Sequence, residues 1–405
     1  MEMPLTAVTL LAQWRQSRAI IIVFATVLLV ALGDLRNGVT PLGYWIAWFA
    51  IAALGGDIAA RCLACFISNR VLFLIFVGFY LMVFSMVLSA IVNEDITTAY
   101  QAVKVALIFA IFVVVVGCMA ELCRDDFVNI CLVVVLIVTV VFVVGKYFFP
   151  NYYILLGDGR QGSIVAYPGV MWKTAVFFSF FLIINAAPHK YMRYTAFGCA
   201  LFLLLSDGSR TGMIWYAIVL FAYSGHRVIS MGNKLYAGLV GVGVSCLTAL
   251  GVVLLLASDF LENIALRFLA GDPVREKMLG DGLHHLGDCL VLGCGFASTF
   301  SLVGGEPMVV HNAYLAVFGD MGIVGFVALI ILLVAPLCFC LRRGSAWSDM
   351  KILAVLAYTG FPFLFVFHPF STELSEWGLW VVLSAVLARC GGVEVPRSKS
   401  GTHVS

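Results

Sequence analysis

Charged residues are scarce in this sequence. Only 11% of the 405 residues are charged and 62% are hydrophobic, whereas a soluble globular domain has roughly 25% charged residues. This scarcity excludes an ordinary soluble domain, and the repeated long apolar runs favour an all-α, polytopic integral membrane protein. The formal net charge is only +2, which gives no reason to expect a nucleic-acid partner.

The sequence also lacks internal repeats, heptad arrays and low-complexity tracts, which favours a single transmembrane domain over residues 1–405. No cleavable signal peptide is evident. The first apolar run, Ala19–Leu32, follows Arg15 and Arg18 and leads into further apolar runs. This pattern is typical of a signal anchor.

The twelve cysteines lie mostly in apolar runs, where they act as small hydrophobic residues. Cys62 and Cys65 have the spacing of a metal-binding pair, but no second pair accompanies them, so we expect no zinc site there. Cys289 and Cys294 share one polar segment. They could form a disulfide if that segment faces an oxidising compartment.

Hydropathy predicts about twelve transmembrane helices. A long polar interval, residues 258–310, precedes the tenth of them, and residues 391–405 form a polar tail. Most of the 24 basic residues fall in loops on the same side of the membrane as the N-terminus, which predicts cytoplasmic termini and a large periplasmic loop with short helices at 258–310. The predicted spans lie near residues 17–33, 42–57, 71–92, 99–120, 127–149, 169–187, 194–206, 211–224, 235–257, 312–340, 350–368 and 374–389.

Several cations fall on the outer side against this trend. They come from three loops: Arg160, Arg210, and the long loop with Arg267 and Arg275. A guanidinium group suits phosphate because its fork of donors matches two oxygens at once. The alternative is a solvated turn arginine for Arg160 and an anchor to lipid headgroups for Arg210.

The long loop ends at His311, and the spacing of Tyr314 and Leu315 behind it predicts that a helix begins here. The positive end of a helix dipole disfavours imidazolium, so a neutral histidine able to accept a proton is expected; a structural histidine at the interface is the alternative. Within the loop, Leu261–Leu279 has a helical apolar pattern in which Pro273 breaks the helix or starts another. The other loop histidines, His284 and His285, show no metal-ligand spacing.

Short motifs, taken in order, resemble the O-antigen ligase and polymerase superfamily of bacterial envelope membrane proteins. They are Gly159-Arg160-Gln161-Gly162, Ser209-Arg210-Thr211-Gly212, the loop residue Arg275, Leu292–Phe296, His311-Asn312-Ala313-Tyr314-Leu315 and Gly319–Gly325.

This resemblance implies a GT-C-like glycosyltransferase of the bacterial inner membrane with its active site facing the periplasm. It implies transfer of O-antigen from undecaprenyl pyrophosphate to lipid A–core, in lipopolysaccharide biosynthesis, without a metal or cofactor. The implied catalytic residues are His311, Arg210 and Arg275. The implied substrate-binding residues are Arg160, Arg267, Asn312 and Tyr314.

Two other functions remain open. A polymerase of the same superfamily would differ only in its acceptor, which no residue reports. A transporter of an anionic lipid-linked glycan belongs to another class, but transporters often show internal repeats and polar sites near the midplane. Here only Lys104 is expected deep in a span.

Overall fold

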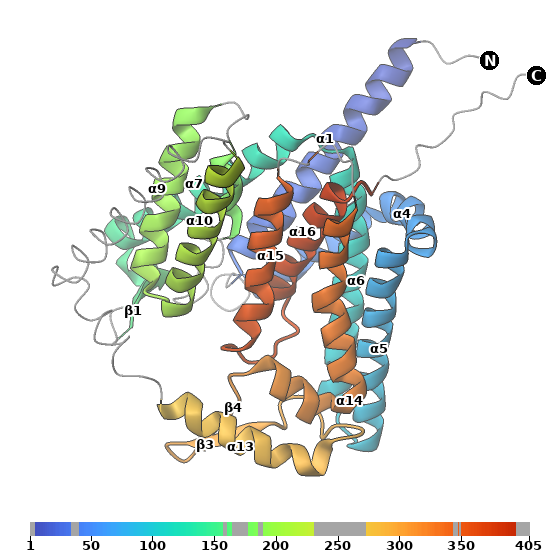
Figure 1. The fold of residues 1–405 in the computed structure, drawn as a ribbon, viewed down its shortest axis with the longest axis vertical. Helices are drawn as coiled ribbons and strands as arrows, with labels where there is room; N and C mark the ends of the chain where they lie inside the picture. The colour runs from blue at the N-terminus through green and yellow to red at the C-terminus, as the bar shows by residue number, and fades with distance from the viewer. Residues whose placement is uncertain are drawn as a thin grey trace, which may run out of the picture.

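The computed structural model of this chain describes residues 5–33, 40–156, 160–163, 177–184, 189–230, 273–342, 347 and 350–393. Helices dominate this part of the chain (Figure 1). The α-helices are α1 (Leu5–Ala31), α3 (Pro41–Leu54), α4 (Gly56–Ser68), α5 (Arg70–Val92), α6 (Ile96–Glu121), α7 (Arg124–Phe148), α9 (Lys190–Asp207), α10 (Arg210–Ser230), α13 (Pro273–Cys289), α14 (Ala313–Val334), α15 (Lys351–Phe365) and α16 (Leu374–Cys390). The 3-10 helices are η1 (Pro150–Tyr152), η2 (Phe180–Ile183) and η3 (Ala335–Leu341).

Two small antiparallel hairpins add to the helices, and the sequence did not predict either of them. Strand β1 (Tyr153–Leu155) pairs with β2 (Gln161–Ser163), and β3 (Phe300–Val303) pairs with β4 (Glu306–Val309). In the second hairpin, a turn at Gly304 and Gly305 joins the strands, and both glycines have positive φ angles that other residues rarely adopt. The interval predicted as a loop with short helices thus holds α13 and a hairpin among its described residues.

Five helices in the described ranges are long and apolar enough to cross a membrane, as expected for a multi-pass membrane protein: Gln13–Ala31, Arg70–Val92, Ile96–Glu121, Arg124–Phe148 and Ala313–Leu341. A sixth crossing is possible where α3 and α4 form a broken pair, bent by 64°. The predicted span near 235–257 lies outside the described residues, as does most of the one near 169–187. The total of about twelve spans therefore stays a prediction.

Helix α6 lies inside the bundle, packed against α1, α4, α5 and α16. The polar groups of Trp380 and Tyr358, which lie among buried aromatic rings, are paired, as an apolar environment favours. The indole nitrogen of Trp380 donates to the hydroxyl of Tyr358 at 3.0 Å, and that hydroxyl donates to the carbonyl oxygen of Leu333 at 2.9 Å. These bonds join α14, α15 and α16 in one core.

A partly buried ion pair fixes the segment between α15 and α16 to α6. Lys104 Nζ lies 2.9 Å from Glu373 Oε1, and the two side chains are 9% and 24% exposed. The neighbouring hydroxyl of Thr372 donates to the side-chain oxygen of Gln101. Lys104, expected deep in a span, therefore has a structural partner.

Replacing Lys104 by methionine is expected to lower the free energy of unfolding by about 1–3 kcal/mol, because it leaves a partly buried carboxylate without its cation. Adding Glu373→Gln removes the second charge as well and should restore most of the loss. Thermal unfolding of both variants in detergent measures this difference. An equal loss in the single and double variants would show that the charge pair is not the cause.

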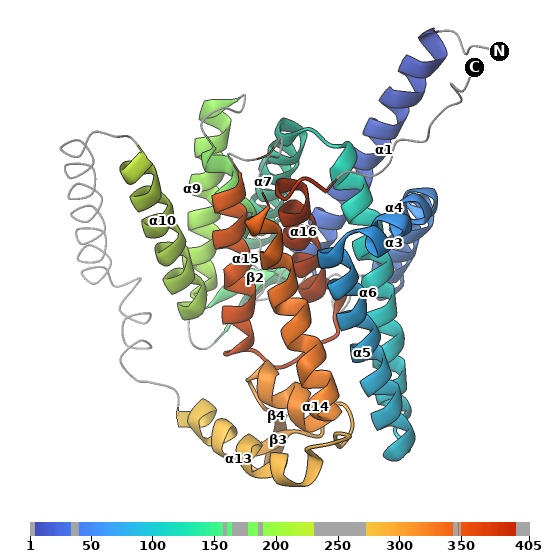
Figure 2. The same cartoon turned by 45° about the vertical axis from the view of Figure 1, so that its right-hand side comes forward.

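Helix α13 and the β3–β4 hairpin lie together at one end of the bundle, near the first half of α14 and the end of α5 (Figure 2). Figure 1 shows this end opposite the start of α1. Helix α14 is broken at Gly322, whose φ of 68° and ψ of −169° are not helical. The break separates the first half, which begins after His311, from the longer apolar half.

Candidate functional site

A cavity of about 500 Å³ lies where α10, α13, α14 and α15 meet. Its lining contains all three predicted catalytic residues, Arg210, Arg275 and His311, which are far apart in the sequence. The remaining lining residues are Thr211, Ile214, Glu276, Met278, Leu279, Val310, Asn312, Phe363, Val366 and Phe367. Sequence reasoning missed the contributions of Glu276 and of the end of α15.

Arg210 reaches the cavity because a tight turn joins α9 to α10. Gly208 ends α9 in the left-handed conformation, with φ 67°. Ser209 then accepts a hydrogen bond from the backbone N–H of Gly212 at 3.3 Å, which caps the start of α10. Arg210 is therefore the first residue of α10, and it lines the cavity.

Arg275 lies in the first turn of α13, which begins at Pro273. Proline suits this position because it needs no N–H partner there. The buried Met278 packs this helix inward. On the hairpin side, Lys277 donates to the carbonyl oxygen of Leu302 at 2.6 Å. The packing of Met278 holds this part of α13, with Arg275, at the cavity.

His311 and Asn312 directly precede α14. The side-chain oxygen of Asn312 accepts from the backbone N–H of Leu315 at 3.1 Å, so this residue caps the helix as well as lining the cavity. Val310 is fully buried and its N–H donates to the carbonyl oxygen of Thr299 at 3.1 Å. The prediction that a helix begins after His311 is confirmed.

Two other predicted substrate-binding residues, Tyr314 and Arg160, lie outside the cavity lining. The hydroxyl of Tyr314 donates to the carbonyl oxygen of Pro362 at 2.9 Å, which ties α14 to α15, and Tyr314 does not line the cavity. Arg160 lies just before β2 and its carbonyl oxygen accepts from Leu156; it is also outside the lining. Arg267 lies outside the described residues. Tyr314 and Arg160 are therefore not among the residues that line the cavity.

The electrostatics of the lining favour an anion with more than one charge. First-turn residues of α10 and α13, and the cap of α14, all line the cavity. Each helix N-terminus carries partial positive charge and N–H groups that helix bonds do not use. Two guanidinium groups add full charges, and Glu276 contributes one carboxylate. The apolar side chains of the lining provide a dry wall beside this charged end.

Asp320 is a further residue whose importance sequence reasoning missed. Its carboxylate is 1% exposed. Oδ2 accepts from the N–H of Ala297 at 2.7 Å, and Oδ1 accepts from the N–H of Thr299 at 2.9 Å and from its hydroxyl at 2.7 Å. The hydroxyl of Ser298 donates to Oδ1 at 3.1 Å. A single acid inside an apolar run is the signal that could have pointed to it.

Two glycine motifs meet at this carboxylate. A Cβ atom on Gly293 would lie 2.3 Å from the carbonyl oxygen of Asp320, and one on Gly322 would lie 2.3 Å from that of Val291. Both glycines have positive φ. We call this contact between residues 290–299 and 319–323 the clasp. It joins the Leu292–Phe296 motif to the Gly319–Gly325 motif and orients the half of α14 that begins at His311.

Helix α6 holds the clasp from the other side. The hydroxyl of Thr98 accepts from the N–H of Phe296 at 2.6 Å. Asp95 caps α6, and the hydrogen bond from the Thr98 hydroxyl is the main cause that lowers the pKa of its carboxyl group. The clasp is thus connected to the centre of the bundle.

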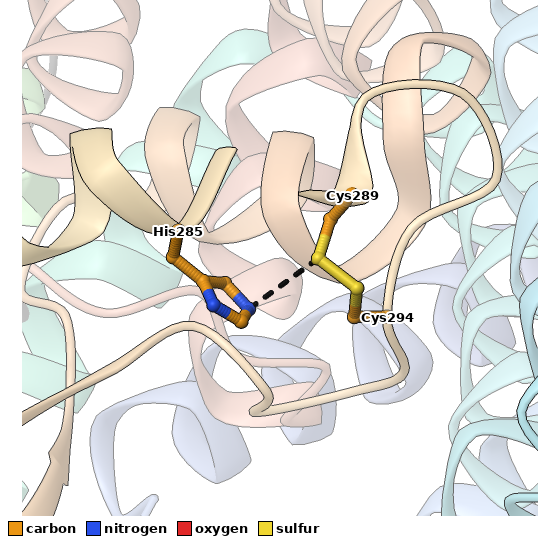
Figure 3. A group of neighbouring side chains, drawn as sticks. All are labelled: His285, Cys289 and Cys294. Atoms are coloured by element: carbon orange, nitrogen blue, oxygen red, sulfur yellow. Dashed lines mark hydrogen bonds between the residues drawn. A yellow bond between two sulfur atoms is a disulfide. The ribbon is translucent and has the colours of Figure 1, made fainter. Parts of the chain in front are cut away.

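A disulfide closes the clasp turn. Cys289 and Cys294 are bonded, with His285 Nε2 lying 3.5 Å from Cys289 Sγ (Figure 3). The possible ligand atoms of these three residues lie close enough together to hold a metal ion. The sulfurs are joined to each other here, so they offer no thiolate to a metal. The sequence alone did not decide whether Cys289 and Cys294 form a disulfide, and the structure shows that they do.

Replacing Cys294 by serine is expected to cost about 2 kcal/mol of stability, the loop-closure entropy of a short loop. Val291 and its neighbours would then be held by the clasp hydrogen bonds alone. Thermal unfolding without reductant measures the loss, with Cys199→Ser as a control because Cys199 is a free cysteine on α9. If both serine variants melt like the parent protein, the disulfide does not stabilise the clasp.

No protein-family model matches this chain, and no curated protein matches it. The likeness to the O-antigen ligase and polymerase superfamily rests on the short motifs alone. The cavity is a separate observation, and it brings residues from three of those motifs together.

Proposed function

We propose that this chain is an O-antigen ligase, a glycosyltransferase that moves O-antigen from undecaprenyl pyrophosphate to a sugar hydroxyl of lipid A–core. The observation that carries the proposal is the shared cavity lined by Arg210, Arg275 and His311. In this proposal the protein is GT-C-like, with about twelve spans, in the bacterial inner membrane. The end that carries α13 faces the periplasm, where both lipid-linked substrates are presented.

Arg210 and Arg275 bind the diphosphate of the donor in this mechanism. Charge grows on the phosphate oxygen as the bond from the anomeric carbon to that oxygen breaks, and the two guanidinium groups stabilise this charge. Since they start at helix N-termini, the helix dipoles act in the same direction. Undecaprenyl pyrophosphate is the leaving group.

His311 acts on the acceptor. Its imidazole takes the proton of the sugar hydroxyl while the acceptor oxygen forms the new bond to the anomeric carbon from the opposite side, which inverts that carbon. The apolar lining, including Phe363 and Phe367, is placed to hold the first isoprene units of the donor. The acceptor is the second lipid-linked glycan at this surface.

EDTA treatment is expected to leave the rate of transfer unchanged, because two guanidinium groups serve the diphosphate in place of a divalent cation. The measurement compares purified protein before and after chelation, with a metal-dependent glycosyltransferase treated in parallel. Activity that is lost to EDTA and restored by magnesium would contradict the metal-independent mechanism.

Gel analysis of lipopolysaccharide from a strain lacking this chain tests the function. If the chain is a ligase, its loss leaves lipid A–core without O-antigen, while lipid-linked polymer accumulates. A polymerase loss instead leaves core capped by a single unit, which would identify the sister activity. A transporter loss leaves lipid-linked glycan on the cytoplasmic face, so accumulation there would overturn both glycosyltransferase assignments.

A further inference from the structure

The turn after α13 exposes three consecutive large apolar side chains. Leu290, Val291 and Leu292 are 47%, 68% and 38% exposed. The disulfide between Cys289 and Cys294 closes this turn. Its backbone is fixed by the clasp, so the three side chains stay outward. Exposed apolar residues in such a tightly held turn need an apolar partner.

The turn continues the side of α14 that faces away from the bundle. The backbone N–H of Ile323 donates to the carbonyl oxygen of Leu290 at 2.9 Å, so the turn sits directly at the start of the apolar half of α14. This half exposes one row of side chains at helical spacing: Ile323, Val327, Ile330 and Val334. In a helix of this length and hydropathy, that row faces lipid.

The end of helix α5 also lies beside this turn. The side-chain nitrogen of Asn93 donates to the carbonyl oxygen of Gly293 at 3.2 Å, next to the turn. Just before Asn93, α5 ends with Ile91 and Val92, which are 70% and 52% exposed. The exposed apolar surfaces of α5 and α14 therefore both run up to the turn.

We propose that the Leu290–Leu292 turn inserts into the bilayer leaflet at this end of the bundle, with lipid acyl chains as its partner. The continuity with the lipid-facing rows of α5 and α14 distinguishes this partner from another protein. The proposal follows from the membrane-protein class and does not depend on the proposed glycosyltransferase activity.

The insertion would set the height of α13 relative to the membrane. One end of α13 carries Arg275 at the cavity, and the other end carries Cys289 at the turn. Fourteen residues of helix separate them, about 21 Å at 1.5 Å per residue. The helix is therefore held at the cavity by its first turn and at the lipid by its last.

Photocrosslinking in liposomes tests the insertion. The photoreactive residue p-benzoylphenylalanine is placed at Val291 in the full chain, an exposed position that tolerates a large side chain. The matched positions are Ile330 on the lipid-facing row and Glu306, an exposed residue of the hairpin. Intact-mass spectrometry then counts covalent phospholipid adducts at each position.

We expect lipid adducts at Val291 at a yield comparable with Ile330 and well above Glu306. Adducts at Ile330 show that each preparation is inserted and folded. A yield at Val291 equal to that at Glu306 would overturn the proposal, as would a crosslink from Val291 to a second copy of this chain instead of lipid.

Discussion

Alanine at Arg275 or Arg210 is expected to reduce glycan transfer by about 100- to 1,000-fold, the usual effect of removing one preorganised group that stabilises transition-state charge. Both side chains line the cavity, and both start from helix N-termini. The loss should fall mainly on kcat, because the charge develops as the bond breaks. Steady-state kinetics with purified protein, lipid-linked donor and lipid A–core measure it.

Two variants control this experiment. Lys277→Ala removes a cation two residues along α13, whose Nζ bonds the Leu302 carbonyl oxygen and does not line the cavity, and it should retain activity. Arg275→Lys keeps the charge but loses the two-pronged fork, so it should restore activity only in part. Equal rates for Arg275→Ala and Lys277→Ala would remove the arginines from the mechanism.

The same assay separates the role of His311 from that of the arginines. His311→Ala should lower kcat by about 100- to 10,000-fold if the imidazole is the general base. Because Asn312, and not His311, caps α14, the helix start should survive the change. Full activity in His311→Ala would remove the base assignment while leaving the diphosphate site in place.

Asp320→Ala is expected to lower the free energy of unfolding by about 3 kcal/mol or more, since four donors lose their acceptor and each buried donor without a partner costs about 1–3 kcal/mol. The donors are the backbone N–H groups of Ala297 and Thr299 and the hydroxyls of Ser298 and Thr299. Thermal unfolding of the detergent-solubilised protein measures the change.

Graded variants make this prediction sharper. Asp320→Asn keeps an oxygen for Thr299 but sets an amide N–H₂ against the N–H of Ala297, so its loss should be intermediate. Thr299→Val removes one hydroxyl and should cost about 1 kcal/mol. If Asp320→Ala were as stable as Thr299→Val, the carboxylate would not hold the clasp together.

Hydropathy located the main spans well because a long apolar run reports burial in lipid directly. The run predicted at 71–92 is α5, Arg70–Val92, to within one residue. The same method missed the bend between α3 and α4. That bend depends on Gly55, where a Cβ atom would lie 2.2 Å from a methyl group of Val114 on α6, and no local pattern reports such a tertiary contact.

The candidate site was predictable in part for a similar reason. Arg210 and Arg275 stood out because they lie on the outer side, against the trend of the basic residues, and His311 because a helix begins behind it. The partners of Asp320 could not be predicted in this way, since residues 297–299 lie about twenty positions earlier and meet it only through the break in α14. The same holds for Phe363 and Phe367, which only the fold brings to the cavity.

The binding of undecaprenyl pyrophosphate to the purified protein tests the central claim most directly. The measurement compares its dissociation constant with that of undecaprenyl monophosphate, for the parent protein and for the Arg210→Ala/Arg275→Ala double variant. The parent should prefer the diphosphate, and the double variant should lose that preference while retaining the affinity that comes from the polyprenyl chain. An unchanged preference for the diphosphate in the double variant would contradict a diphosphate site formed by these two arginines.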